Sequence, residues 1–272
     1  MAIQTLNQVI TQAVADIQHY GYDSQNRVDN WIRTILAVAN AYSDTDAADY
    51  LKRSLGGKYT RLVTDGAIQK QHKIPTFTLE KIKPFLRAEL DRRIMASANL
   101  IKLNRQAAIQ KTLQRFSGWA TSIPVGGSDA IDKVPLKMEI AKPLKSLSFI
   151  ERRVAIDQGH KLIANINDIV AVEAGAIAAI WHSHWRQSGY NYDPDHKKLD
   201  EKVFAIKGNW AQKDGLMKVG PDGYTDDIIK PSERPFCRCY YQYLYNLDSL
   251  PDNMLTDKYR KKVKEVSRVI NA

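Results

Sequence analysis

The sequence predicts an α+β fold, in which a helical N-terminal unit and long helices precede a small mixed or antiparallel sheet and a basic C-terminal helix. Two observations support this prediction. Before Trp181, apolar residues recur at helical spacing over long stretches. After Trp181, short apolar runs alternate with turns rich in glycine and proline, which is typical of short strands. Residues 181–246 also hold both cysteines and three of the six histidines, so we expect one specialised substructure there.

Residues 1–57 predict a small helical unit. Apolar side chains repeat at helical spacing over residues 1–20, and Gly21 should end this helix because glycine favours helix termini. A second apolar face runs from Val28 to Ala41, and a third helix should end at Gly56-Gly57. We expect these apolar residues to form a core, since the unit shows no catalytic signature.

Residues 58–78 are polar and basic in their first part, and we interpret them as a linker. Residues 79–250 then form the predicted main α+β domain. Within it, residues 79–119 show the apolar spacing of one long helix with a proline near its start. Residues 129–147 contain two prolines between short apolar runs, and we expect them to be irregular.

Helical spacing returns from Phe149 to about Trp181, and Gly175 should break this helix into two pieces. Residues 202–207 read as a short strand, and residues 238–246 read as a strand because tyrosine is dense there. Residues 251–272 contain the predicted basic C-terminal helix, which has an apolar stripe on one side.

The formal net charge of +10 is distributed unevenly. Residues 1–50 carry two basic and six acidic side chains, a balance of −4, so the rest of the chain carries +14. A basic surface favours contact with a polyanion or an acidic protein, although it can also be merely solvated. The candidate contacts with DNA or a partner lie in the C-terminal helix: Lys258, Arg260, Lys261, Lys262, Lys264 and Arg268.

Two absences bear on where the protein is made. We find no run of about 18 apolar residues, so we expect no membrane-spanning helix and no membrane partner. The first residues lack the pattern of a signal peptide. Cys237 and Cys239 are separated by one residue, so a bond between them would be strained and could not tie distant segments together. We therefore expect two free thiols and synthesis in a reducing cytoplasm.

A zinc site is one interpretation of residues 181–246. His182 and His184, together with Cys237 and Cys239, offer four side chains of the type that zinc prefers. Their spacing argues against it, because one intervening residue places two side chains on opposite faces of a strand. We therefore expect no metal and no cofactor.

A metal-dependent enzyme acting on nucleic acid is the alternative function. His196 would act as general base, with Asp193, Asp195 or Asp200 as metal ligands. No second acidic cluster of suitable spacing supports this chemistry, and the same residues suit a surface turn. We therefore expect no catalytic residues.

A family resemblance rests on several motifs in a particular order, within about residues 85–247. They are Asn99-Leu100-Ile101-Lys102, Gly126-Gly127-Ser128-Asp129, the Arg-rich stretch 151–157, Trp181, His196-Lys197-Lys198-Leu199-Asp200, and Pro231 to Cys239 with its Cys-Arg-Cys end. This ordered set resembles the phage Mu-type head morphogenesis family of minor capsid proteins. The family often has glycine after the Leu-Asp pair, where this chain has Glu201, so the turn there is expected to differ.

The resemblance implies a bacteriophage minor head protein that acts by binding and not by catalysis. Its expected partners are portal, scaffold or capsid proteins and, without sequence preference, packaged double-stranded DNA. Its expected place is the virion, in the head interior or at the portal vertex, after synthesis in the host cytoplasm. The motif residues would then be structural: Trp181, His196, Leu199, Asp200, Pro231, Cys237, Arg238 and Cys239.

The resemblance also implies contacts for these motif residues. The two cysteines would be small core residues on opposite faces of the tyrosine-rich strand. Arg238 would pair with an acid such as Asp200, and His196 would hydrogen-bond a loop carbonyl.

Overall fold

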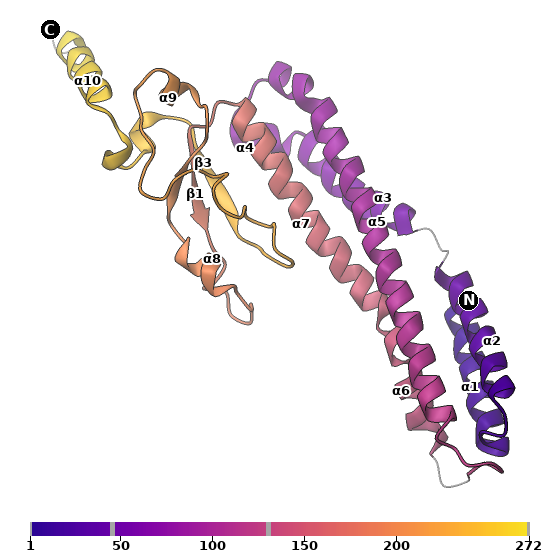
Figure 1. Cartoon of the computed structure of the whole chain (residues 1–272). Helices are drawn as coiled ribbons and strands as arrows, with labels where there is room; N and C mark the ends of the chain where they lie inside the picture. Colours follow the sequence, from indigo (N-terminus) through magenta and orange to yellow (C-terminus); the bar gives the residue numbers. More distant parts are fainter. Residues whose placement is uncertain (1, 44–46, 129–131, 271–272) are drawn as a thin grey trace. The chain divides into compact units, whose positions relative to one another are not determined.

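The computed structural model describes residues 2–43, 47–128 and 132–270, and most of these residues are helical (Figure 1). The helices that precede the sheet are α1 (Ala2–Tyr20), α2 (Gln25–Ser43), α3 (Ala47–Tyr59), the π-helical turn η1 (Thr60–Thr64), α4 (Ala67–His72), α5 (Thr76–Ala120), α6 (Lys133–Lys145) and α7 (Leu147–Glu173). The elements that follow are β1 (Ala178–His182), α8 (Pro194–Lys198), β2 (Val203–Ala205), α9 (Trp210–Lys213), β3 (Tyr240–Leu244), η2 (Leu247–Ser249), η3 (Asp252–Met254) and α10 (Asp257–Ile270). The predicted α+β fold is confirmed. Among the described residues, we find no helix with the length and apolar character needed to cross a bilayer.

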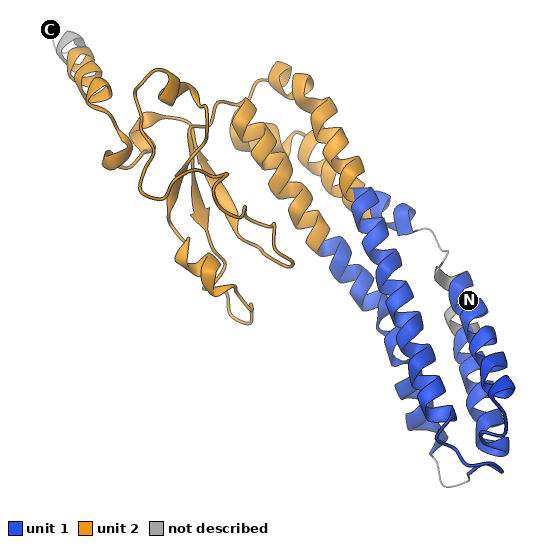
Figure 2. Ribbon diagram, in the orientation of Figure 1, with its two compact units in different colours: residues 1–53, 94–156 blue, residues 54–93, 157–272 orange. Residues whose placement is uncertain are grey.

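Two compact units divide the chain (Figure 2). Unit 1 comprises Met1–Arg53 and Ile94–Ile156, and unit 2 comprises Ser54–Arg93 and Asp157–Ala272. Each unit thus combines two stretches of sequence, whereas the predicted ranges followed the chain consecutively. Residues 58–78, predicted as a linker, are mostly helical in the structure.

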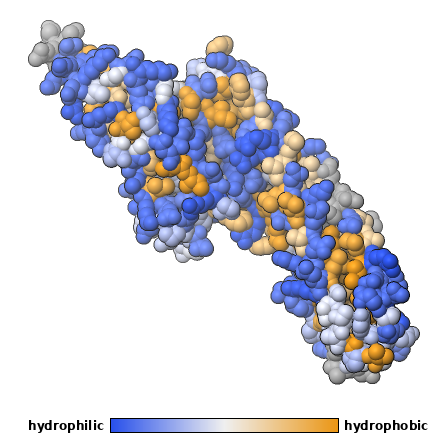
Figure 3. Space-filling model, in the orientation of Figure 1, coloured by the Kyte–Doolittle hydropathy of each residue, from blue (hydrophilic) through white to orange (hydrophobic). Residues whose placement is uncertain are grey.

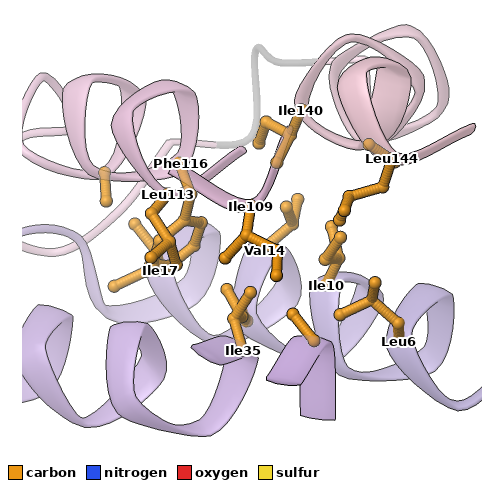
Figure 4. Packing of buried hydrophobic residues seen from close by; sticks show 14 of the residues in the cluster. Leu6, Ile10, Val14, Ile17, Ile35, Ile109, Leu113, Phe116, Ile140 and Leu144 are labelled. Carbon is orange, nitrogen blue, oxygen red and sulfur yellow. The ribbon is translucent and has the colours of Figure 1, made fainter. Parts of the chain in front are cut away.

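Unit 1 has a continuous apolar core (Figure 4). Leu6, Ile10 and Val14 lie on one face of α1, as their helical spacing predicts. They pack in the same cluster as Ile35 of α2 and Ile109 of α5. Residues at 3.6-residue periodicity are buried here because each helix must remove one apolar stripe from water. The predicted helices over residues 1–20 and 28–41 are therefore confirmed.

A close approach between two backbones in unit 1 requires glycine. Gly21 and Gly127 both have left-handed φ values, 71° and 83°. A Cβ atom on Gly21 would lie 1.8 Å from the Pro124 oxygen, and one on Gly127 would lie 2.2 Å from the Gln18 oxygen. The loop that follows α5 is also bonded to the end of α1, since the Ser128 amide donates to the Gln18 oxygen at 3.0 Å. Gly21 ends α1, as predicted.

Helix α6 corrects one prediction. Of the stretch 129–147, expected to be irregular, the described part consists mainly of this helix, and its first three residues lie outside the described ranges. Asp132 caps the helix by accepting a backbone N–H. Pro143 has no N–H to bond the carbonyl four residues earlier, that of Glu139. The Arg115 guanidinium donates to that carbonyl instead, at 2.6 Å, so the proline is tolerated.

Two helix ends also differ from prediction. Helix α3 continues through Gly56-Gly57, and the buried side chains of Leu51 and Leu55 offset the low helix propensity of glycine. Helix α7 ends before Gly175, whose φ of 81° is that of a helix C-terminus. The residues from there to Trp181 were expected to be helical, but they include strand β1. An apolar run of this length fits a buried strand as well as a helix.

The sheet of unit 2 has the strand order β2-β1-β3, with both pairings antiparallel. Ala179 of β1 lies opposite Phe204 of β2 and Tyr243 of β3, and Trp181 lies opposite Tyr241. The central strand β1 has no exposed residue, whereas β3 alternates between exposed and less exposed residues. The predicted strands over residues 202–207 and 238–246 are confirmed as β2 and β3.

Candidate functional site

A small buried cluster in unit 2 brings together residues that are far apart in sequence. Trp181 of β1 and Phe204 of β2 pack with Cys237 and Cys239, which precede β3. His196 of α8 joins them with its ring edge against the Trp181 ring, the centroids 5.3 Å apart. All five side chains are buried, with His196 only 2% exposed. We call His196, Cys237 and Cys239 the His–Cys–Cys cluster.

The two sulfur atoms converge on one ring nitrogen. The Nδ1 atom of His196 lies 3.4 Å from the Sγ atom of Cys237 and 3.6 Å from that of Cys239. The Nε2 atom has no hydrogen-bond partner among the described residues, and the nearest carboxylate oxygen, of Asp193, lies 4.0 Å away. The ring therefore points its δ nitrogen at two sulfurs and its ε nitrogen at an acid. The expected hydrogen bond from His196 to a loop carbonyl is therefore wrong for the described residues, because Nδ1 faces the two sulfurs.

The cysteine side chains point the same way, which corrects the expectation of opposite faces. Both residues precede β3 and lie in irregular backbone, so the alternation of a strand does not apply to them. Phe236, just before them, has a left-handed φ of 60°, which turns the chain. Both thiols are free, as predicted.

The pKa values of the two thiols are shifted in opposite directions. The Cys237 thiol hydrogen-bonds to the Cys239 sulfur, which lowers the pKa of Cys239 and raises the pKa of Cys237. Burial opposes ionisation of both groups. The hydrogen bond and burial therefore both raise the pKa of Cys237, whereas on Cys239 they act in opposite directions.

The loop that carries the cysteines is held by Asp157 and Tyr190. Asp157 of α7 accepts a hydrogen bond from the Phe236 amide at 2.6 Å. The Tyr190 hydroxyl donates to the Phe236 carbonyl and accepts from the Arg238 amide, both at 3.2 Å. The Arg238 guanidinium lies over the Tyr190 ring, 5.8 Å from its centroid. Arg238 therefore does not pair with Asp200, and that expectation is wrong.

Asp200 instead closes the turn after α8. Its carboxylate accepts from the Ser183 amide and from the Trp185 indole N–H, each at 2.7 Å. Burial acts to raise its pKa, but these two bonds hold the pKa below the usual value of an aspartate. The next residue, Glu201, has a φ of 66°, the conformation that glycine adopts most easily. The turn thus has the shape that glycine would favour, although the residue is glutamate.

Two other motif residues support the cluster. Leu199 packs against it from the end of α8. Pro231 is buried at the start of the cysteine loop. The glycine-serine motif after α5 lies in unit 1, and its last residue, Asp129, is outside the described part of the chain. The structure therefore gathers the motifs from Trp181 onward, which all belong to unit 2.

The acids proposed as metal ligands of an enzyme are engaged elsewhere. Asp193 accepts from the Asp195 amide and pairs with Arg234. Asp195 pairs with Lys198 at 3.0 Å. Asp200 bonds to the loop of Ser183, as described above. These carboxylates do not converge on one point, so the arrangement does not favour the alternative of a metal-dependent enzyme.

His182 and His184, the other histidines proposed for zinc, have different neighbours. His182 Nε2 lies 2.9 Å from the Gln242 side-chain oxygen, and its ring stacks on Tyr240. The His184 ring contacts Tyr190 and Tyr240. The histidine that meets the cysteines is therefore His196, which spacing alone did not indicate.

A cavity of about 290 Å³ lies beside the cluster, between α7 and β3. Asp168 lines it and bonds to Lys230 at 2.9 Å and to the Tyr243 hydroxyl at 3.1 Å. Burial acts to lower the pKa of Lys230, but Asp168 raises it above its usual value. These three residues were not predicted from the sequence. A usable signal was the set of polar residues on α7 at helical spacing, namely Asp157, Lys161, Asn165 and Asp168.

The basic side chains of α10 differ in their contacts. Lys258 donates to the Asp214 carbonyl at 2.7 Å, and Arg260 donates to the Asp252 carbonyl at 3.0 Å. Both of these side chains are nevertheless exposed, as are Lys261, Lys262 and Lys264. The side chain of Arg268 lies outside the described part of the chain.

No family model, curated protein or solved structure matches this chain. The fold and the site define an α+β protein whose C-terminal part is assembled around a buried His–Cys–Cys cluster.

Proposed function

We propose that the protein is a bacteriophage minor head protein that binds portal, scaffold or capsid proteins during head assembly. The observation that carries the proposal is the convergence of the motifs. Trp181, His196 and the two cysteines, which occur in the order typical of the Mu-type family, contact one another around one cluster. Residues of a shared family motif are expected to be neighbours when they build one module. The role is binding in the virion, in the head interior or at the portal vertex.

Exposed apolar side chains support binding to other proteins. On α5, Phe77 and Phe85 are 80% and 67% exposed, and both belong to unit 2. In unit 1, Met95 and Leu103 of the same helix are also exposed. Figure 3 shows apolar residues gathered in patches on the face in view. Exposed apolar surface of this kind is typical of protein interaction sites.

The C-terminal helix supports contact with DNA. Tyr259 anchors α10 to the core of the C-terminal segment, and its hydroxyl bonds to Asp248. Beyond this anchor, Lys261, Lys262 and Lys264 are exposed to solvent. Basic side chains free to approach phosphates bind DNA by releasing counterions, which involves no base recognition. Binding should therefore be independent of sequence and should weaken steeply as salt rises.

Two experiments test the proposed function. Mass spectrometry of heads and head precursors, purified from cells that produce the protein with its neighbouring gene products, should find the chain at low copy number. The portal protein should also co-purify with it. Removal of residues 257–272 should weaken incorporation or DNA binding and leave unit 2 folded, because the sheet ends before this segment. A chain missing from both heads and precursors would refute the proposal.

A further inference from the structure

We propose that His196, Cys237 and Cys239 bind one Zn²⁺ ion, which acts as a structural centre of unit 2. The inference stands on the geometry of the cluster and does not depend on the proposed role in head assembly. It departs from the expectation of no metal, which rested on an assumed strand through both cysteines.

The distances fit a tetrahedral centre. Zinc binds thiolate sulfur at about 2.3 Å and imidazole nitrogen at about 2.0–2.1 Å. At a tetrahedral angle, these bonds place nitrogen and sulfur about 3.6 Å apart and two sulfurs about 3.8 Å apart. The observed separations from Nδ1 are 3.4 Å and 3.6 Å, and all three ligand atoms lie within 4.8 Å of one another. The two nitrogen–sulfur separations therefore match those expected for ligands of one ion.

The chemistry of the donors selects zinc. Two thiolates and an imidazole are the soft and borderline ligands that Zn²⁺ prefers, whereas Mg²⁺ and Ca²⁺ prefer oxygen. A single hydrogen atom cannot bond well to Nδ1 and both sulfurs at once, but a metal ion satisfies all three. Three protein ligands leave a fourth position for water or for the Ser183 hydroxyl, whose oxygen lies 3.8 Å from the Cys239 sulfur.

Asp193 completes the arrangement as a positioning residue. A histidine that binds metal through one nitrogen usually donates its other N–H to a carboxylate. His196 Nε2 is buried and has no hydrogen-bond partner in the part of the chain that the structure describes, and the Asp193 oxygen lies 4.0 Å away. Arg234 holds that carboxylate through an ion pair. With Nδ1 bound to the metal, the N–H of Nε2 points toward Asp193.

Burial indicates a structural role for the ion. His196, Cys237 and Cys239 are 2%, 5% and 3% exposed and pack against two large aromatic rings. The ion would join α8 to the loop before β3, two segments 41 residues apart in sequence. Such a centre stabilises the fold directly, because the site does not exist in the unfolded chain.

The test begins with the full chain produced in zinc-supplemented medium. Elemental analysis should find about one zinc per chain, since the cluster offers ligands for one ion. After removal of the metal by a chelator, titration with Co²⁺ alone should produce the thiolate charge-transfer band and the visible bands of tetrahedral cobalt. Protein without stoichiometric zinc, whose metal-free form shows no such bands with Co²⁺, would overturn the proposal.

Variants then assign the ligands. Cys237→Ser, Cys239→Ser and His196→Gln should each lose stoichiometric zinc. His184→Gln is the matched control, because the side-chain ring of this neighbouring histidine lies against Tyr190 and Tyr240 and is not one of the three converging ligands, and it should retain the metal. Asp193→Asn should weaken zinc affinity about 10- to 100-fold. Loss of zinc in His184→Gln together with its retention in His196→Gln would refute the assignment. If a ligand variant fails to fold, the cobalt titration of the unmodified chain still decides the question.

Discussion

Asp157 holds the cysteine loop through a short hydrogen bond. Its Oδ1 atom accepts the Phe236 amide at 2.6 Å, and its Oδ2 atom lies 3.3 Å from the Lys161 ammonium. The side chains of this ion pair are only 9% and 12% exposed. Replacement by alanine would remove this acceptor of the Phe236 amide and the ion pair with Lys161.

The expected loss in the free energy of unfolding follows from these contacts. A hydrogen bond to a charged acceptor contributes about 1.5–3 kcal/mol, and the ion pair within the helix adds about 0.5 kcal/mol. Alanine has a higher helix propensity than aspartate, which offsets about 0.5 kcal/mol of this loss. We therefore expect Asp157→Ala to lower the free energy of unfolding by about 1.5–3 kcal/mol. Asp157→Asn keeps an acceptor and should cost less than half of this.

Urea unfolding monitored by tryptophan fluorescence measures the effect, at fixed zinc concentration and with the slope m checked for constancy. An Asp157→Ala variant within about 0.5 kcal/mol of the unmodified chain would refute the reasoning. So would an Asn variant that costs as much as the Ala variant, because the acceptor would then be irrelevant.

Three further predictions concern backbone conformation and pH. Gly127→Ala should destabilise unit 1 by about 2–4 kcal/mol more than Gly126→Ala in urea unfolding, since both positions are left-handed but only Gly127 faces a backbone oxygen, that of Gln18 at 2.2 Å; equal costs would contradict this. Glu201→Gly should raise stability by up to about 1 kcal/mol in the same assay, because it relieves a φ of 66°, and a loss would count against it. Burial lowers the pKa of His72, so the unfolded chain takes up a proton first as pH falls below about 6.5, and stability decreases toward acid. Thermal unfolding between about pH 7.5 and about pH 5.5 should show a shallower loss in His72→Gln, and an unchanged slope would exclude this histidine as a source.

Much of the fold could be predicted because apolar periodicity is a strong signal. Helices α1, α2 and α5 and strands β2 and β3 follow it directly. Helix α6 was missed because Pro143 was expected to interrupt it. The proline is tolerated because the Arg115 guanidinium donates to the Glu139 carbonyl in place of the missing backbone N–H. Strand β1 was missed because a short apolar run carries no period that separates strand from helix.

The site could be located but not assembled from the sequence. The clustering of histidines and cysteines pointed to the right segment, yet His196 could not be distinguished from His182 or His184. That choice depends on the pairing of β1 with its neighbours and on the turn at Phe236, neither of which is encoded in a spacing of residues. Asp157 was noted as part of a motif, but its bond to the loop joins positions that are 79 residues apart.

Four non-glycine residues of the described ranges have left-handed backbones, and three of them flank the His–Cys–Cys cluster: Glu201, Ser232 and Phe236. Each such residue costs about 1–2 kcal/mol relative to its preferred conformation. The shape of this segment is therefore imposed by its contacts and not by its own residues. Glu201 and Phe236 are exposed, so these two positions can change to glycine or asparagine at little cost. The backbone conformation around the cluster can thus persist in related proteins whose residues at these positions differ.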